Sequence, residues 1–397
     1  MKVSIPTPVS INIPLPSDTQ AASMDDIDTA EKILDDVGEV NSENLMVALK
    51  AQREAINTAP QVDTETAISN SLLEGINNSA LELEILNGWT EGGKAMFSSI
   101  ISGMCDNILK DGKIEGIELE DMLQLVLLEA MVNQEKYGLE GFFKNTKVED
   151  SIQHLLESVG SASHGLHESP WDKPETLAQA AVYVLKEMLE QHTPPEGSLL
   201  EKLITTSGFN TESKVIELYK QIKEKYHNGD GWLIYNKNQQ NGTEAAKKIS
   251  PLICLMITSD ILKEKPDITK EQMNKLLSQD IKEIESVMKD VFKEKEGFDS
   301  ILNWIKHGDQ QPGDKWQIQE HHHNDTGKHG GQLDWVGNGL NIKDLENIYN
   351  NFPSRVLSDE DIKDINRIGD NVKMIMQTLK YWFQILRDER VAIARNI

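Results

Sequence analysis

The last forty residues of the chain carry the clearest periodic pattern of apolar and polar positions. Apolar residues recur there at alternating spacings of three and four, at Ile365, Ile368, Val372, Ile375, Leu379, Trp382 and Leu386, and Phe383 widens the same surface. This spacing is typical of a coiled-coil seam. These eight residues are therefore predicted to form an assembly interface, packed either against the protein's own bundle or against a neighbouring copy.

The ends of this C-terminal helix are also marked in the sequence. Ser358 is a favourable N-cap, and the three residues 359–361 are all acidic, which suits the positive end of a helix dipole. Arginines occur near the opposite end, at 387, 390 and 395, where the dipole favours basic residues. The pattern predicts a helix from residue 359 to about 394, roughly 50 Å long at 1.5 Å per residue.

The interior of the chain is predicted to be helical almost throughout. Residues 116–138 form the most hydrophobic helix, and because it is apolar on most sides it needs cover inside a bundle. Further helices are expected at 172–192, 244–263 and 269–295. Between turn signals, Trp232, Ile234 and Tyr235 predict a short strand.

The predicted fold class is mainly α, with elongated helical bundles, little β structure, a disordered N-terminal tail and a long C-terminal coiled-coil helix. Changes of composition suggest five segments. They are a tail at 1–24, an acidic helical domain at 25–165, a central helical domain at 166–307 with an insert at 226–243, a Gly/His-rich loop at 308–341, and a helical hairpin or coiled coil at 342–397.

The first seventeen residues contain no acidic residue. Apolar residues occupy odd positions, and prolines occupy the even positions 6, 8, 14 and 16. In an extended chain, proline therefore blocks one edge and leaves the donors of the other edge available. Such a segment is either a disordered tail or a strand that adds to a partner's sheet. The apolar residues of this segment, for which a docking or export role remains open, are Val3, Ile5, Val9, Ile11, Ile13 and Leu15.

Charge and hydropathy exclude several classes of protein. The formal net charge is −25, and residues 1–160 carry 28 acidic against 10 basic residues. This field disfavours a general role in binding nucleic acid or anionic lipid. The most apolar runs, which begin at Met122 and Pro251, are shorter than the roughly 20 residues of a spanning helix, so no transmembrane segment is predicted. Cys105 and Cys254 suggest no disulfide framework.

Motifs for catalysis are absent from the sequence: it has no G-x-S-x-G, phosphate-binding glycine loop or H-E-x-x-H. We therefore predict that the protein is not an enzyme and has no cofactor. The segment "EHHHNDTGKHGG" concentrates four histidines. Three consecutive histidines cannot all reach one ion without a contorted backbone, so a solvated loop, a pH-responsive contact and a metal site all remain open. These four histidines are His321, His322, His323 and His329.

Three features together resemble the hydrophilic secreted components of bacterial type III secretion systems, of the needle-tip or filament-translocator kind. They are the acid-free N-terminus rich in Ser, Thr, Ile and Pro, the acidic helical body, and the terminal helix. Locally, "HGGQLDWVGNGLNIKDLENIYNNFPSRVLSDEDIKDINRIGDNVKMIMQTLKYWFQIL" is similar to filament-type translocators, where G-x-L turns and a short helix precede the terminal helix.

The resemblance implies a non-enzymatic protein that a dedicated chaperone holds in the cytoplasm before export. After export, the protein is expected at the cell surface or in the medium, where the C-terminal helix packs with other secretion components or with copies of itself. Two other classes remain open: a cytosolic helical scaffold or gatekeeper that regulates secretion, and a secreted effector.

Overall fold

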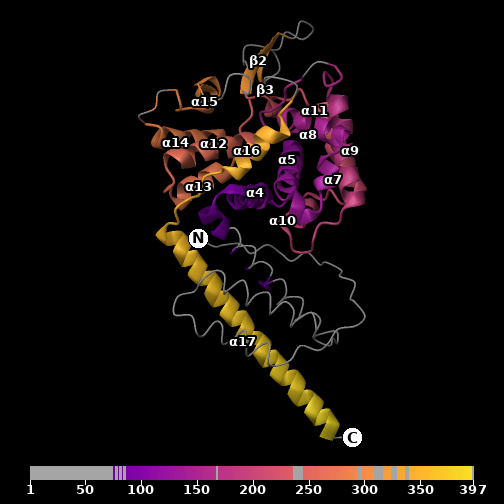
Figure 1. Ribbon diagram of the computed structural model, residues 1–397, viewed down its shortest axis with the longest axis vertical. Helices are drawn as coiled ribbons and strands as arrows, with labels where there is room; N and C mark the ends of the chain where they lie inside the picture. The colour runs from indigo at the N-terminus through magenta and orange to yellow at the C-terminus, as the bar shows by residue number, and fades with distance from the viewer. Residues whose placement is uncertain are drawn as a thin grey trace. The chain divides into compact units, whose positions relative to one another are not determined.

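The computed structural model describes residues 75, 76, 79, 83 and 86–395, apart from 167–168, 236–244, 294, 296, 308–315, 323–328 and 336–338. The chain divides into two compact units. One is Leu81–Ile365, and the other joins Met1–Ala80 to Asn366–Ile397. The predicted class is confirmed in that the described chain is mostly helical (Figure 1). The N-terminal segment with Val3, Ile5, Val9, Ile11, Ile13 and Leu15 lies outside the described residues.

Helix α5 (Ile117–Val132) is the core of the Leu81–Ile365 unit. All of its residues from Leu119 onward are buried, which confirms the prediction for the most hydrophobic helix. Figure 1 shows α5 at the centre of this unit. It is covered by α4 (Gly93–Ile108), α8 (Thr146–Ser158), α10 (Leu199–Ser207), α11 (Glu212–Lys225) and α12 (Pro251–Glu264).

This packing corrects the predicted division of the chain at residue 165. Helices from both sides of that position cover α5, so the segments 25–165 and 166–307 do not fold as separate domains where the structure describes them. A continuous apolar core extends from Trp89 to Phe352. The sequence pattern located several of the helices, although the helix predicted at 244–263 begins only at Pro251, and it carries no information on which of them share a core.

The remaining helices of this unit are short, apart from α9 (Pro174–Gln191), which confirms the helix predicted at 172–192. The segment 269–295 is divided into two helices rather than one, because Gln279 has a positive φ of 60° and the Asp280 side chain caps the second helix. The others are η1 (Leu109–Asp111), α6 (Gln134–Tyr137), α7 (Glu140–Phe143), η2 (Gly229–Gly231), α13 (Lys270–Leu277), α14 (Ile281–Val291), α15 (Ile301–His307) and α16 (Ile342–Asn350).

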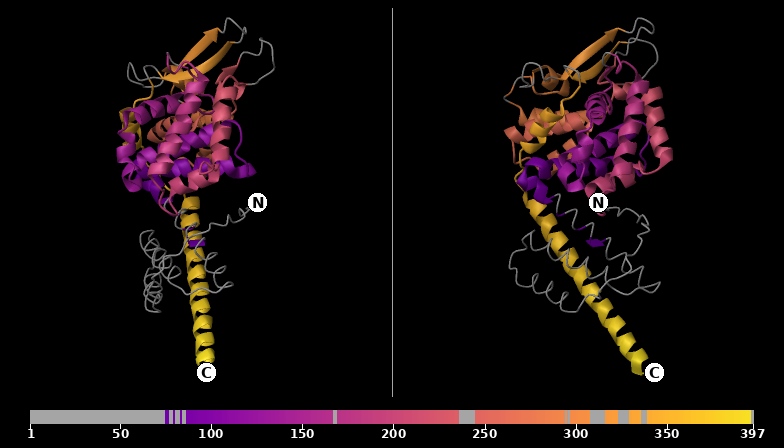
Figure 2. Two further views of the ribbon diagram at one scale, coloured as in Figure 1. Left: turned by 90° about the vertical axis from the view of Figure 1, so that its right-hand side faces the viewer. Right: turned by 45° about the vertical axis from the view of Figure 1, so that its right-hand side comes forward.

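A three-stranded antiparallel sheet replaces part of the loop predicted at 308–341. Strands β2 (Trp316–His322) and β3 (His329–Trp335) pair along their length, and β1 (Ile234–Tyr235) lies on the other edge of β3. Figure 2 shows β2 and β3 side by side at one end of the compact unit. The predicted short strand near Trp232 is thus confirmed as β1, although its partner lies about a hundred residues away in the sequence.

The loop prediction was wrong because this segment is rich in glycine, histidine and glutamine. Among these residues, the alternation of apolar and polar positions that marks a strand is carried by only a few side chains. Trp316 lies directly opposite Trp335, and Ile318 opposite Leu333, so one face of the hairpin is apolar. The two tryptophan rings meet edge to face with centroids 5.2 Å apart. This face joins the core, because Trp316, Leu333 and Trp335 are buried.

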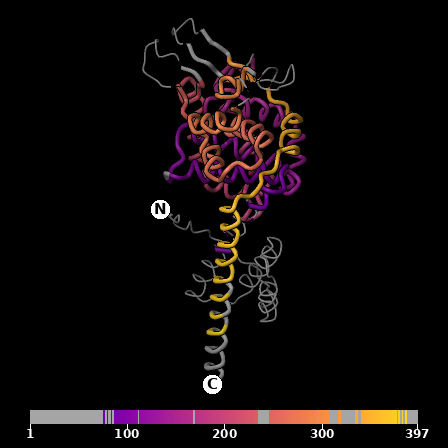
Figure 3. The backbone as a smooth tube through the Cα atoms, turned by 90° about the vertical axis from the view of Figure 1, so that its left-hand side faces the viewer, coloured from indigo at the N-terminus to yellow at the C-terminus, as the bar shows by residue number. Residues whose placement is uncertain are grey.

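Helix α17 (Asp359–Arg395) confirms the predicted C-terminal helix and its boundaries. Figure 3 follows the backbone from α16 through residues 351–358 into α17. The predicted segment 342–397 is nevertheless divided, because α16 packs on α4 within the Leu81–Ile365 unit, whereas α17 from Asn366 onward belongs to the other unit. Pairing of α17 in a coiled coil stays a prediction.

A close contact between a loop and the hairpin provides a test of the fold. A Cβ added at Gly165 would lie 2.4 Å from the Leu333 carbonyl oxygen in β3, whereas a Cβ at Gly141 in α7 would meet nothing within 4 Å. We expect Gly165→Ala to lower the free energy of unfolding by about 1–3 kcal/mol. Gly141→Ala is the matched control, and we expect it to be neutral or to stabilise by up to about 1 kcal/mol.

Urea unfolding followed by circular dichroism measures both effects. Equal stability of the two variants would show that the loop does not press against β3.

Candidate functional site

The first turn of α17 is closed by its own side chains. The Ser358 amide and hydroxyl both donate to Asp361 Oδ2, over 2.7 and 2.6 Å, and the Asp361 amide donates back to Ser358 Oγ over 3.4 Å. This is a capping box with aspartate in the usual place of glutamate. The predicted N-cap role of Ser358 is confirmed.

A buried ion pair fixes the start of the same helix. Arg355 Nη1 lies 2.8 Å from Asp361 Oδ2, and both side chains are fully buried. Arg355 Nε also donates to the Ile268 carbonyl over 3.1 Å, and the guanidinium lies 4.7 Å from the centroid of the Trp89 ring. These partners offset part of the desolvation of the two buried charges. We call Arg355 and Asp361, with these contacts, the α17 anchor.

Two further contacts tie the α17 anchor to the start of α13. The Val356 amide donates to the Pro266 carbonyl over 2.9 Å, and Lys270 forms an ion pair with Asp364. The Lys270–Asp364 pair is partly exposed, at 32% and 27% of the two side chains. It therefore adds less to stability than the enclosed pair.

The predicted seam is buried over its first half. Ile368 and Val372 are buried, and Ile365 and Ile375 are half-buried. A Cβ at Gly75 would lie 3.3 Å from Ile375 Cδ1, so the seam meets a glycine of the same unit there. The rest of the predicted seam also lies on α17. The side chains of its residues there are outside the part of the chain that the structure describes; they are Leu379, Trp382, Phe383 and Leu386.

A second polar cluster lies on α5. His164 Nε2 is 2.9 Å from Glu120 Oε2, which also accepts from the Gly160 amide over 3.0 Å, and the Gln221 side chain donates to the other oxygen over 3.1 Å. The imidazole stacks on the Tyr226 ring with centroids 4.2 Å apart. A histidine–carboxylate pair is common in catalysis. Here both side chains are fully buried, so the pair positions the loop at residues 160–165 rather than meeting a substrate.

Glu129 forms a third buried cluster at the other end of α5. It accepts hydrogen bonds from Tyr137 over 2.6 Å, Ser98 over 2.8 Å and Asn133 over 2.9 Å. Burial raises the pKa of the Glu129 carboxyl to about 7, and these donors oppose that rise. The group is therefore a proton acceptor near neutral pH that lies inside the core.

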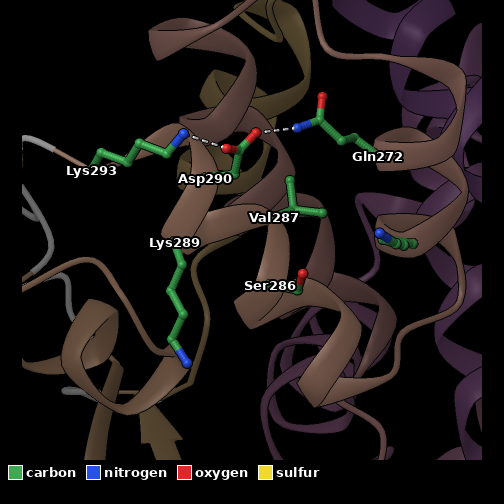
Figure 4. A pocket seen from close by; sticks show the side chains of 7 residues that line it. Gln272, Ser286, Val287, Lys289, Asp290 and Lys293 are labelled. Atoms are coloured by element: carbon green, nitrogen blue, oxygen red, sulfur yellow. Dashed lines mark hydrogen bonds and ion pairs between the residues drawn. The ribbon is translucent and has the colours of Figure 1, made fainter.

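A shallow polar groove of about 420 Å³ lies between α13 and α14. In Figure 4, Asp290 lies between Lys293 and Gln272, which both bond its carboxylate over 2.7 Å, and Lys289 points away from them. The groove's carboxylate is thus already neutralised, and nothing in it resembles a catalytic arrangement. The lining residues are Gln272, Lys275, Ser286, Val287, Lys289, Asp290 and Lys293.

The described histidines of the histidine-rich segment lie in β2 and β3. In the strand pairing, His322 is directly opposite His329, and His321 is opposite Gly330. His323 lies outside the described residues. Within the part of the chain that the structure describes, no group of three or more His, Cys, Asp or Glu residues could hold a metal ion.

Cys105 and Cys254 do not provide a nucleophile. Both are buried and outside any disulfide, and burial raises the pKa of each thiol to about 12. A thiol with so high a pKa carries almost no thiolate at neutral pH.

Comparisons of the chain with protein-family models, with curated proteins and with solved structures found no match. Among the described helices, none is both long enough and apolar enough to cross a bilayer. The geometry of the chain's own residues is therefore what bears on function.

Sequence reasoning missed the α17 anchor and the polar clusters on α5. Charged residues in a helix that is apolar on most sides were the available signal for the clusters, because Glu120, Asp121 and Glu129 interrupt that helix. The signal for the anchor was weaker. Ser358 and Asp361 mark a cap, but no spacing connects Arg355 to Trp89 or Ile268.

The anchor can be tested by removing its cation. Arg355→Met leaves the Asp361 carboxylate buried without its countercharge, and we expect the free energy of unfolding to fall by about 3–5 kcal/mol. The matched control, Lys270→Met, breaks the partly exposed pair and should cost at most about 1 kcal/mol. Urea unfolding measures both losses. A loss for Arg355→Met no larger than that of the control would contradict the anchor.

Glu129 predicts a pH dependence of stability. Its pKa is about 7 in the folded protein against an ordinary 4.5, so the folded state holds the proton more tightly. Stability from this group is present at low pH and is lost as the pH rises from about 4.5 to about 7. We expect the wild type to lose about 3 kcal/mol relative to Glu129→Gln across this window.

Urea unfolding at a series of pH values measures this difference between the two proteins. Glu135→Gln, at an exposed position, is the control and should follow the wild-type curve. Parallel curves for the wild type and Glu129→Gln would show that Glu129 does not titrate in this window.

Proposed function

We propose that this protein is a non-enzymatic component exported by a bacterial type III secretion system. In this proposal it acts in assembly, or at the tip of the secretion needle or translocon, through the packing of α17. The observation that carries the proposal is a 37-residue C-terminal helix with a fully buried ion pair at its start, and its sequence carries the predicted coiled-coil seam. Such a pair holds one end of the helix in place, and the seam beyond it supplies apolar surface for packing.

The N-terminal segment supports the export part of the proposal. Its first seventeen residues have no acid, and prolines break every apolar run. A proline-interrupted chain resists helix and central-strand formation. In the cytoplasm, a secretion chaperone would pair with the open edge that carries Val3 to Leu15. After export, other secretion components or further copies of the chain would bind α17.

What supports a non-enzymatic role is where the reactive groups lie. The His164–Glu120 pair is enclosed, the described thiols are buried, and the carboxylate in the α13–α14 groove is neutralised. A cytosolic scaffold or gatekeeper is the second candidate, favoured by the apolar core that unites helices from most of the chain.

Export can be tested directly. The full-length chain and a variant lacking residues 2–17 are produced in a type III-competent strain and in a strain without the export ATPase. We expect the full-length protein in the culture supernatant of the competent strain only, and the shortened variant in the cell pellet of both. Immunoblots of supernatant and pellet, with a cytoplasmic enzyme as a lysis control, measure the distribution.

Retention of the full-length protein in the competent strain would contradict export and favour the cytosolic scaffold. Export of both forms would show that residues 2–17 are not needed for export, and would leave the rest of the proposal standing.

A further inference from the structure

Two buried carboxyl groups meet where the β2–β3 hairpin lies on α8. Glu157 belongs to α8 and Asp334 to β3, and the two residues are exposed at 0% and 2%. The Trp335 amide donates to Glu157 Oε1 over 3.0 Å, and the Gln317 side chain donates to Asp334 Oδ2 over 3.0 Å. These contacts join the helix to both strands of the hairpin.

The two carboxyl groups also form a hydrogen bond with each other. Because an ionised carboxylate has no hydrogen to donate, this bond requires one proton on the pair. The Trp335 amide and the Gln317 side chain each occupy one oxygen, which leaves Glu157 Oε2 and Asp334 Oδ1 to share the proton. Glu157 retains it, because burial, followed by the bond to Asp334 and its charge, raises the pKa of Glu157 well above the ordinary 4.5.

The surroundings of the pair supply no countercharge. Among the described residues, those that act on the Glu157 carboxyl include no basic side chain. The other titratable groups in this part of the core are Tyr226, whose pKa is raised by burial and then by nearby acids, and His164, which is engaged with Glu120. A second negative charge on the pair would therefore be buried without compensation, which is costly.

We propose that the proton shared by Glu157 and Asp334 locks the hairpin onto α8, and that the hairpin opens when this proton leaves. In the open form water reaches Glu157 and its pKa returns toward 4.5, so opening releases a proton. The lock is therefore firmest at acidic pH. Above about 4.5, each unit of pH raises the opening equilibrium constant by up to about tenfold, until the pH reaches the pKa of Glu157 in the closed form.

Opening changes the surface of the protein as well as its charge. The hairpin face that carries Trp316, Leu333 and Trp335 is buried in the closed form and becomes accessible in the open one. The proton thus controls access to an apolar face. This lock is a property of the Leu81–Ile365 unit and does not depend on export.

Hydrogen exchange of the full-length chain, followed by mass spectrometry at about pH 6, 7 and 8, measures the opening. Peptides that cover β2 and β3 report the hairpin, and peptides from α9 report unfolding of the whole unit. We expect a larger opening constant in the hairpin than in α9 at each pH. Equal constants in the two regions would contradict the proposal, because the hairpin would then not open separately.

Glu157→Gln tests the proton itself. The glutamine amide has the shape of the protonated carboxyl, can donate to Asp334 and does not ionise. We expect the opening constant of the wild-type hairpin to rise relative to that of Glu157→Gln by up to about tenfold per pH unit. Groups that both proteins keep cancel from this ratio, and they include the strand histidines His321, His322 and His329.

Two further variants complete the comparison. Asp334→Asn supplies a donor from the other side of the bond, so it should also reduce the rise with pH, and it replaces Glu157→Gln if that variant does not fold. The matched control, Glu224→Gln, changes an exposed acid on α11 and should follow the wild type. Circular dichroism checks that each variant is folded.

Two results from these variants would overturn the proposal. A ratio of wild type to Glu157→Gln that stays constant from about pH 6 to 8 would show that the pair holds no proton that opening releases. A flattened pH dependence in Glu224→Gln equal to that in Glu157→Gln would show that the loss of any acid has the same effect.

Discussion

The buried ion pair between Arg355 and Asp361 sets where the C-terminal helix begins. Enclosing two charges costs several kcal/mol for each, and the further partners of each charge offset part of that cost. Arg355 reaches Ile268 and Trp89, and Asp361 closes the cap at Ser358. Arg355 and Asp361 must both occupy their positions for the cap and the ion pair to form, so these contacts fix the start of the helix. A helix that began one residue earlier or later would lose its cap and its countercharge together.

The same rule governs the interior around α5. Gln124 donates to the carbonyls of Leu156 and Val159 and accepts from the Leu252 amide, so one side chain joins three segments. Asp121 accepts from both the amide and the hydroxyl of Ser161. An all-apolar helix would pack in many ways, whereas each of these groups is satisfied in one arrangement only. The polar groups therefore select the packing, and the apolar groups supply most of its stability.

Prediction from sequence succeeded where the signal is local. The C-terminal helix combines a cap, a dipole-matched first turn and a seven-residue period, and its boundaries were predicted to within a residue. The hairpin was missed because its alternation is carried by a few residues, such as Trp316 and Leu333, among glycines and histidines. The α17 anchor could not be predicted, because Arg355 meets Trp89 and Ile268 only after the chain has folded.

Two stretches of seventeen residues, 1–17 and 371–387, contain no acidic residue, in a chain whose net charge is −25. Covering an apolar surface costs more when ionised side chains must lose water beside it. Where acids are absent, that cost is low, while the acids elsewhere keep copies of the chain apart by repulsion. Residues 371–387 of α17 are both acid-free and mostly apolar, and this distribution favours association with a chosen partner over indiscriminate aggregation. The charge pattern and the apolar pattern of the helix thus both act on its association: the charges determine the selectivity and the apolar residues the affinity.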